Sequence, residues 1–146
     1  MVVRLKIAPQ YREPEIHICC DREDAKTKEI LTSVENLFGS SIFAYREEEV
    51  FKIPTMEIVK IYTENKNVYV ATTKGNYRIK ERLYEMENRL SQNGFVRISN
   101  TDLVNVDKIE RLDTGITGTI IMKLSGGIEA YVSRRYVSKI KKALGI

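Results

Sequence analysis

The side chains best suited to recognition chemistry lie in one polar corner, Ser99-Asn100-Thr101-Asp102, between two segments that alternate apolar and polar residues. Ser, Asn, Thr and Asp side chains hydrogen-bond their own backbone, so the corner is expected to form a rigid turn. A rigid turn holds an exposed amide in a fixed direction. The corner therefore favours recognition by hydrogen bonds, although Asn100 could also serve only as a cap of its own turn.

The sequence gives little support to catalysis. The only histidine, His17, has no partner at a spacing typical of a Ser–His–Asp or Cys–His pair. Cys19 and Cys20 are followed by Asp21, an acidic neighbour that disfavours a reactive thiolate. One histidine and two adjacent cysteines do not predict a metal site, and Gly126-Gly127 lacks the lysine of a phosphate-binding loop. We expect no enzymatic activity, no cofactor and no small-molecule substrate.

The charge is unevenly distributed along the chain. Its net value is +4, but residues 1–49 carry 7 basic and 10 acidic side chains, whereas residues 50–146 carry 17 and 10. The basic part suggests a polyanionic partner, although a mildly basic solvated surface would have the same composition. No apolar run approaches the roughly 20 residues of a membrane span, and residues 1–7 do not form a signal peptide. These features predict a soluble cytoplasmic protein.

Residues 1–38 have the pattern of two strands and a helix. Apolar residues alternate over residues 2–7 and 15–20, which predicts two strands. A helix is expected after Asp21 as N-cap, ending at Gly39. Such a unit is too small to be stable alone and should pack on something.

Residues 40–146 have a mainly β pattern with few helices, giving an α+β class overall. Alternation and turn residues predict strands over 41–45, 50–53, 58–62, 68–72, 77–79, 95–98, 103–106, 110–112, 119–124 and 128–132. Helical spacing predicts helices over 80–90 and 134–144, the second capped by Ser133 and ended by Gly145. The composition changes near residues 39–41, which marks a boundary between an extension, 1–38, and a domain, 40–146.

Several segments of the second part resemble the signature of LytTR-type DNA-binding domains. They are Phe95–Asn100, Leu103–Ile109, Leu124–Gly127 and Val132–Tyr136, in that order. The resemblance covers about residues 40–146. It implies an elongated, mainly β domain with short antiparallel sheets. It also implies a bacterial transcription regulator that places loops in successive major grooves of duplex DNA.

The resemblance also implies DNA-contacting residues. Asn100 and Arg135 match base-contacting positions, and Asn can pair with adenine and Arg with guanine. The turn before residues 68–72 supplies a third contact, from Asn65, Lys66, Asn67 or Val68. Arg97 and Arg134 match motif positions that are either structural or face phosphates, and Ser99 stands where the family commonly has His. Lys139 on the last helix would attract phosphates or complement the helix dipole.

The chain leaves no room for the phospho-receiver domain that many members of this family carry. It resembles the small stand-alone LytTR regulators, some of which are paired with small membrane proteins. The expected partners are double-stranded DNA with paired half-sites, a second copy bound through residues 1–38, and a small membrane regulatory protein. The alternative is a module that binds a protein or membrane inhibitor, with weak or lost DNA binding.

Overall fold

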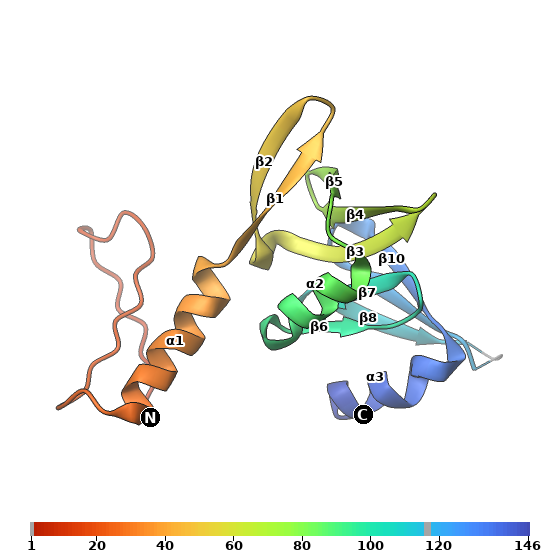
Figure 1. Ribbon diagram of the computed structural model, residues 1–146. Helices are drawn as coiled ribbons and strands as arrows, with labels where there is room; N and C mark the ends of the chain where they lie inside the picture. Colours follow the sequence, from red (N-terminus) through yellow and green to blue (C-terminus); the bar gives the residue numbers. More distant parts are fainter. Residues whose placement is uncertain (1, 116–117) are drawn as a thin grey trace.

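Two antiparallel sheets form the scaffold of the protein (Figure 1). The computed structural model describes residues 2–115 and 118–146, without the side chains of residues 36–39. The larger sheet has seven strands in the order β2-β1-β5-β4-β3-β7-β6. Their bounds are β1 (Ser41–Arg46), β2 (Glu49–Pro54), β3 (Ile58–Glu64), β4 (Asn67–Thr72), β5 (Gly75–Ile79), β6 (Phe95–Arg97) and β7 (Asp102–Asn105).

The smaller sheet has three strands in the order β10-β9-β8, and helices complete the fold. The remaining bounds are β8 (Ile109–Thr114), β9 (Ile120–Leu124), β10 (Glu129–Val132), α1 (Ala25–Gly39), α2 (Leu83–Arg89) and α3 (Val137–Leu144). Every strand pair within the described residues is antiparallel, so this part of the chain contains no parallel receiver domain. The predicted mainly β class with few helices is confirmed.

Two helices begin later than the sequence predicted. The helix expected from residue 80 begins at Leu83, because Arg82 still has an extended backbone. The last helix begins at Val137 and follows a 3-10 turn, Arg134–Tyr136. Tyr136 N donates to Ser133 O at 2.9 Å, which closes that turn through the backbone. Ser133, the predicted cap, makes no capping hydrogen bond with its side chain.

Two hydrophobic cores lie on opposite faces of the larger sheet. Adjacent residues of a strand point to opposite faces, and β3 places Ile58 in the core beneath α2 and Val59 in the core beneath the smaller sheet and α3. In β7, Leu103 likewise lies in the first of these cores and Val104 in the second. The middle of the larger sheet is therefore packed on both sides, and the turns at its ends are fixed.

The side chain of Asn105 connects β7 to β3 inside this packing. Asn105 is only 3% exposed. Its Nδ2 donates to Ile58 O at 2.9 Å, and its Oδ1 accepts from Asp107 N at 3.0 Å. The amide thus provides partners for two backbone groups that would otherwise be unpaired near the core.

Asn105→Ala is expected to lower the free energy of unfolding by about 1–3 kcal/mol, because it leaves those two backbone groups without partners. Chemical denaturation followed by circular dichroism measures the change. Asn76→Ala, at an exposed position in β5, is the control and should change stability by less than about 0.5 kcal/mol. Equal losses in the free energy of unfolding for the two variants would show that the hydrogen bonds of the buried amide do not stabilise the fold.

The N-terminal extension differs from its prediction. No strand forms within residues 2–24; Val3, Leu5 and Ile7 are 90%, 87% and 87% exposed. A strand needs a neighbour that pairs with its backbone groups, and an isolated hairpin is marginal in water. Alternation alone predicted strands here, but no sheet edge lies beside these segments: residues 2–24 lie next to α1, which leads away from both sheets (Figure 1).

The helix of the extension forms, with a different cap. Asp24, not Asp21, is the N-cap of α1: its side chain accepts from Thr27 N at 2.8 Å, and Thr27 Oγ1 accepts from Asp24 N at 2.8 Å. The hydrogen bond from Thr27 N lowers the pKa of Asp24. α1 ends at Gly39 and β1 begins at Ser41. The division into an extension, 1–38, and a domain, 40–146, stays a prediction.

Candidate nucleic-acid interface

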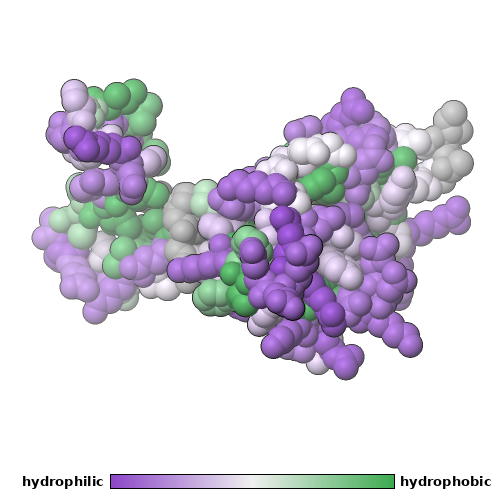
Figure 2. Space-filling model, turned by 90° about the horizontal axis from the view of Figure 1, so that it is seen from above, coloured by the Kyte–Doolittle hydropathy of each residue, from purple (hydrophilic) through white to green (hydrophobic). Residues whose placement is uncertain are grey.

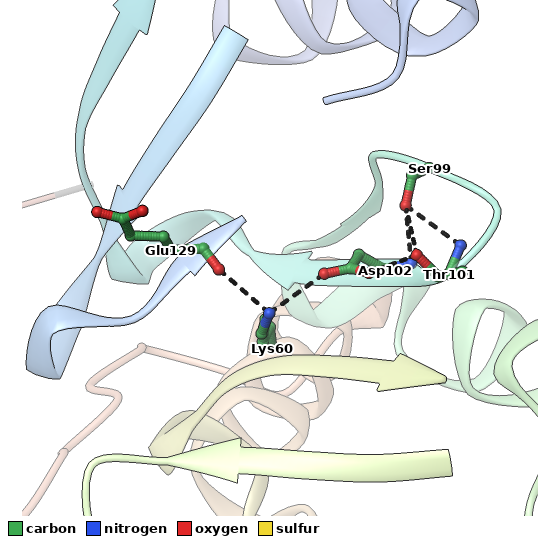
Figure 3. A network of polar contacts seen from close by, with 5 residues as sticks. All are labelled: Lys60, Ser99, Thr101, Asp102 and Glu129. Atoms are coloured by element: carbon green, nitrogen blue, oxygen red, sulfur yellow. Dashed lines mark hydrogen bonds and ion pairs between the residues drawn. The ribbon is translucent and has the colours of Figure 1, made fainter. Parts of the chain in front are cut away.

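The polar corner is a tight turn between β6 and β7. Ile98 N donates to Asp102 O at 3.0 Å. Ser99 Oγ accepts from Thr101 N at 3.2 Å and from Asp102 N at 3.0 Å (Figure 3). The two bonds to Ser99 Oγ are side-chain-to-backbone contacts of the kind that the sequence predicted for a rigid turn.

Arg97 stabilises the same turn through hydrogen bonds from its guanidinium group. Its Nε donates to Ser99 O at 2.6 Å and its Nη2 to Asn100 O at 2.7 Å. Its Nη1 lies 3.0 Å from Glu87 Oε2 on α2, and the Arg97 side chain is only 15% exposed. The guanidinium is thus engaged within the fold, which makes Arg97 well placed to position the turn.

Asn100 is exposed at the tip of the turn. Its backbone oxygen faces Arg97, but its side-chain amide takes part in none of the hydrogen bonds found among residues 2–115 and 118–146. The amide therefore does not cap its own turn, which was the other role that the sequence left open. It is available to a partner.

Lys60 links the corner to both sheets through an ion pair and a hydrogen bond. Lys60 Nζ, on β3, lies 3.3 Å from Asp102 Oδ2 and donates to Glu129 O on β10 at 3.1 Å (Figure 3). The Lys60 and Asp102 side chains are 17% and 16% exposed. The sequence interpretation missed Lys60, although a lysine between Val59 and Ile61 in a buried strand was a signal that it had a specific partner.

Tyr62 continues the same face of β3. Its ring stacks on Tyr69 of β4 with centroids 5.5 Å apart, and Lys60 Nζ lies 4.9 Å from the Tyr62 centroid. Burial raises the pKa of Tyr62, and the nearby Glu64, Tyr69 and Asp102 act in the same direction. Sequence reasoning did not single out Tyr62 either.

The turn between β3 and β4 presents the next group of predicted residues. Glu64 pairs with Asn67 across a two-residue loop. That loop consists of Asn65 and Lys66, whose φ angles of 48° and 66° are both left-handed. This is the geometry of a type I′ turn, whose twist matches that of the flanking strands. Lys66 is exposed at the tip, and Asn67 is half-buried at the start of β4.

Arg134, Arg135 and Lys139 provide the third group. The two arginines are exposed on the 3-10 turn after β10, and Lys139 is exposed on α3. The Arg135 guanidinium lies 5.5 Å from the centroid of the Tyr136 ring, and Lys139 Nζ lies 5.9 Å from it. A half-buried aromatic ring thus holds the two cations at one place on the surface.

Two backbone hydrogen bonds bring the three groups together. Thr63 N donates to Thr101 O at 2.9 Å, which joins the end of β3 to the corner. Ser133 N donates to Ile98 O at 2.9 Å, which joins the corner to the residues before Arg134. A hollow of about 420 Å³ lies between the corner and β10. The structure therefore gathers three predicted segments, far apart in the sequence, around one corner of the scaffold.

Residues 48–145 match the family profile of the LytTr DNA-binding domain. The chain belongs to the LytTR family. This stretch includes all three segments of the candidate interface. The family assignment expected from the motifs is confirmed.

Relatives and a solved structure agree with the LytTR assignment. Uncharacterised HTH-type transcriptional regulators of Staphylococcus aureus strains NCTC 8325 and MRSA252 are 33% and 32% identical over 147 residues, covering 100% of this chain and 99% of theirs. The LytTr DNA-binding domain of a protein described as a methyl-accepting/DNA response regulator from Bacillus cereus has the same fold, with a TM-score of 0.70 and 23% identity. The match covers 73% of this chain and 98% of that one.

The helices of this LytTR protein do not form a helix-turn-helix, despite the name of the relatives. Within residues 2–115 and 118–146, strands separate α1 from α2 and α2 from α3. The candidate interface is made of turns and the strand ends beside them, and of its predicted residues Lys139 lies on a helix. In the same described part, no three His, Cys, Asp or Glu side chains are grouped to hold a metal ion. None of its helices has the length and hydrophobicity of a membrane span.

Proposed function

We propose that the protein is a sequence-specific, DNA-binding transcription regulator that reads major-groove bases with turns of a β scaffold. The observation that carries the proposal is that two backbone hydrogen bonds join the corner to Thr63, which leads into the β3–β4 turn, and to Ser133, which leads into the Arg134–Tyr136 turn. Rigid turns lose little conformational freedom on binding, which favours discrimination between sequences.

The side chains divide into base readers, phosphate contacts and positioning residues. Asn100 has a free amide that can pair with adenine N6 and N7, and Arg135 can pair with guanine O6 and N7. Lys66, Arg134 and Lys139 are exposed cations suited to phosphates. Arg97 and Ser99 use their polar atoms to hold the corner, and so contribute by presenting Asn100. Asn67 is half-buried beside Lys66 and is the last of the predicted residues in the candidate interface.

Two copies are expected to act together on paired half-sites, in the cytoplasm. One copy offers three short turns, and a single set of such contacts covers one half-site only. A homodimer doubles the contacts and the length of sequence read. The extension at residues 1–38 carries none of the proposed DNA contacts, so we expect it to hold the two copies together.

The dependence of DNA affinity on salt tests the proposal. The logarithm of the binding constant should fall linearly with the logarithm of salt concentration, and a selected duplex should be preferred over a scrambled one. Binding that is insensitive to salt and sequence would contradict DNA recognition. It would favour the alternative function, a module for a protein or membrane partner, which the exposed apolar extension also suggests.

Lys139→Ala is expected to weaken binding equally for all duplexes and to reduce the salt slope by about 1, because it removes one phosphate contact. Titrations at several salt concentrations measure the slope. Lys52→Ala is the matched control, since Lys52 is an exposed lysine of β2, on the hairpin at the edge of the larger sheet. An unchanged slope for Lys139→Ala would place α3 away from the DNA backbone.

A further inference from the structure

Exposed apolar side chains are concentrated on the N-terminal extension. Val2, Val3, Leu5, Ile7 and Ile16 are 74%, 90%, 87%, 87% and 58% exposed. Figure 2 shows hydrophobic surface gathered on the extension, at the left, whereas most of the remaining surface in view is hydrophilic. Single exposed apolar residues are common, but a contiguous group marks an interaction site.

We propose that residues 2–35 are a dimerisation unit completed only by a second copy of the chain. In the dimer, residues 2–7 of one copy pair with residues 15–20 of the other, and the two copies share one sheet covered by their α1 helices. The proposal deepens the homodimer of the proposed function, but it concerns self-association and is tested without DNA.

Within one copy the two segments face each other without pairing. A hollow of about 530 Å³ is lined on one side by Arg4–Lys6 and on the other by Glu15, His17 and Cys19. Within described residues 2–23, one backbone hydrogen bond is found, from Tyr11 N to Ala8 O at 3.1 Å. Both segments therefore have backbone groups free to pair with a strand of another copy.

The charges of the two segments are complementary. Residues 2–7 carry Arg4 and Lys6 and no acidic side chain, whereas residues 15–20 carry Glu15 and no lysine or arginine, and their flanks at 13–14 and 21–24 add four acidic side chains and one arginine. Opposite charges on facing strands stabilise pairing, and like charges oppose it. A symmetric pairing of residues 2–7 with themselves would bring the basic side chains of two copies together. Exchange between the basic segment and the acidic one avoids this.

The helix α1 offers an apolar face to the exchanged strands. Ile16, Ile18, Leu31 and Val34 line a hollow of about 420 Å³ between residues 16–20 and the helix. The capping box at Asp24 and Thr27 fixes the start of α1. Helix and strand segment are thus already in contact, and a second copy would cover the apolar surface that remains open.

The overall charge favours a second copy meeting at the extension. Residues 1–38 carry six basic and seven acidic side chains, while residues 39–146 carry 18 and 13. Two copies repel each other through their basic parts, but not through their nearly neutral extensions.

The match with the Staphylococcus aureus relatives covers the whole chain, so it includes this extension.

Sedimentation velocity of the full chain tests the apolar part of the proposal. The wild type should pass from 16.9 kDa to twice that mass as concentration rises. Leu5→Asp/Ile7→Asp should stay monomeric, with thermal unfolding unchanged at concentrations where the wild type is also monomeric. Val50→Asp is the control, because Val50 is 58% exposed on the edge strand β2, and it should dimerise normally. A monomeric wild type, or a dimer lost only in Val50→Asp, overturns the proposal.

A charge-swap experiment tests the exchange between copies. Arg4→Glu/Lys6→Glu and Glu13→Lys/Glu15→Lys should each associate at least tenfold more weakly than wild type, because like charges then face each other in both contacts. An equimolar mixture should recover association, since every contact between unlike copies is complementary again. Recovery requires pairing across copies. If the mixture associates no better than the separate variants, the segments do not exchange and the proposal is wrong.

Discussion

Asn100→Ala and Arg135→Ala should each remove most of the preference for a selected duplex over a scrambled one, at a cost of about 1–3 kcal/mol of discrimination. Asn100 has an exposed amide with no partner among the described residues, and Arg135 is exposed beside the Tyr136 ring. Neither side chain supports the core. The free energy of unfolding should therefore stay the same while sequence preference falls.

Competition titrations at one fixed salt concentration measure this preference. Asn76→Ala in β5 and Arg111→Ala in β8 are matched controls, because both residues are exposed and lie outside the three turns. The controls should keep the preference of the wild type. If Asn100→Ala and Arg135→Ala discriminate like the controls, the base-reading residues have been assigned to the wrong turns.

Asp102→Ala is expected to lower the free energy of unfolding by about 2–3 kcal/mol, because it leaves the Lys60 ammonium with one acceptor among the described residues, in a largely buried site. That acceptor is Glu129 O, at 3.1 Å. Lys60→Met should cost less, since Asp102 keeps a hydrogen bond from Thr101 Oγ1 at 2.7 Å. Urea denaturation of both single variants and of the double variant measures the coupling.

The double variant should lose less stability than the two single variants together, by about 1–2 kcal/mol. The pair Lys28 and Glu23 is the control, since its side chains are 67% and 75% exposed at 3.6 Å. An exposed pair of this kind should show coupling near zero. Strictly additive losses at Lys60 and Asp102 would mean that the ion pair does not hold the corner to the sheets.

The sequence predicted the elements that pack against a neighbour. β1 to β5 and β9 lie where alternation placed them, because their apolar residues enter the cores on the two faces of the larger sheet. The same alternation over residues 2–7 predicted a strand that does not form. Periodicity reports which face of a segment is apolar, but not whether a partner strand lies beside it.

The motifs predict Asn100 and Arg135 as DNA-contacting residues, and this assignment stays a prediction. The structure places both residues on turns, and a hydrogen bond from Ser133 N to Ile98 O joins those turns. Lys60 and Tyr62 were missed, since their contacts with Asp102 and Tyr69 depend on strand register. Backbone hydrogen bonds, such as the one from Thr63 N to Thr101 O, do not depend on side-chain type. The pattern of apolar and polar residues therefore does not predict them.

Selection of bound duplexes from a random pool tests the central claim most directly. If the three turns read bases, repeated rounds with the full chain should enrich one motif made of two half-sites, spaced by whole turns of the DNA helix. The Asn100→Ala/Arg135→Ala variant should retain DNA weakly and enrich no motif. A wild-type pool that stays random, or a motif enriched equally by that variant, would contradict sequence recognition by this surface.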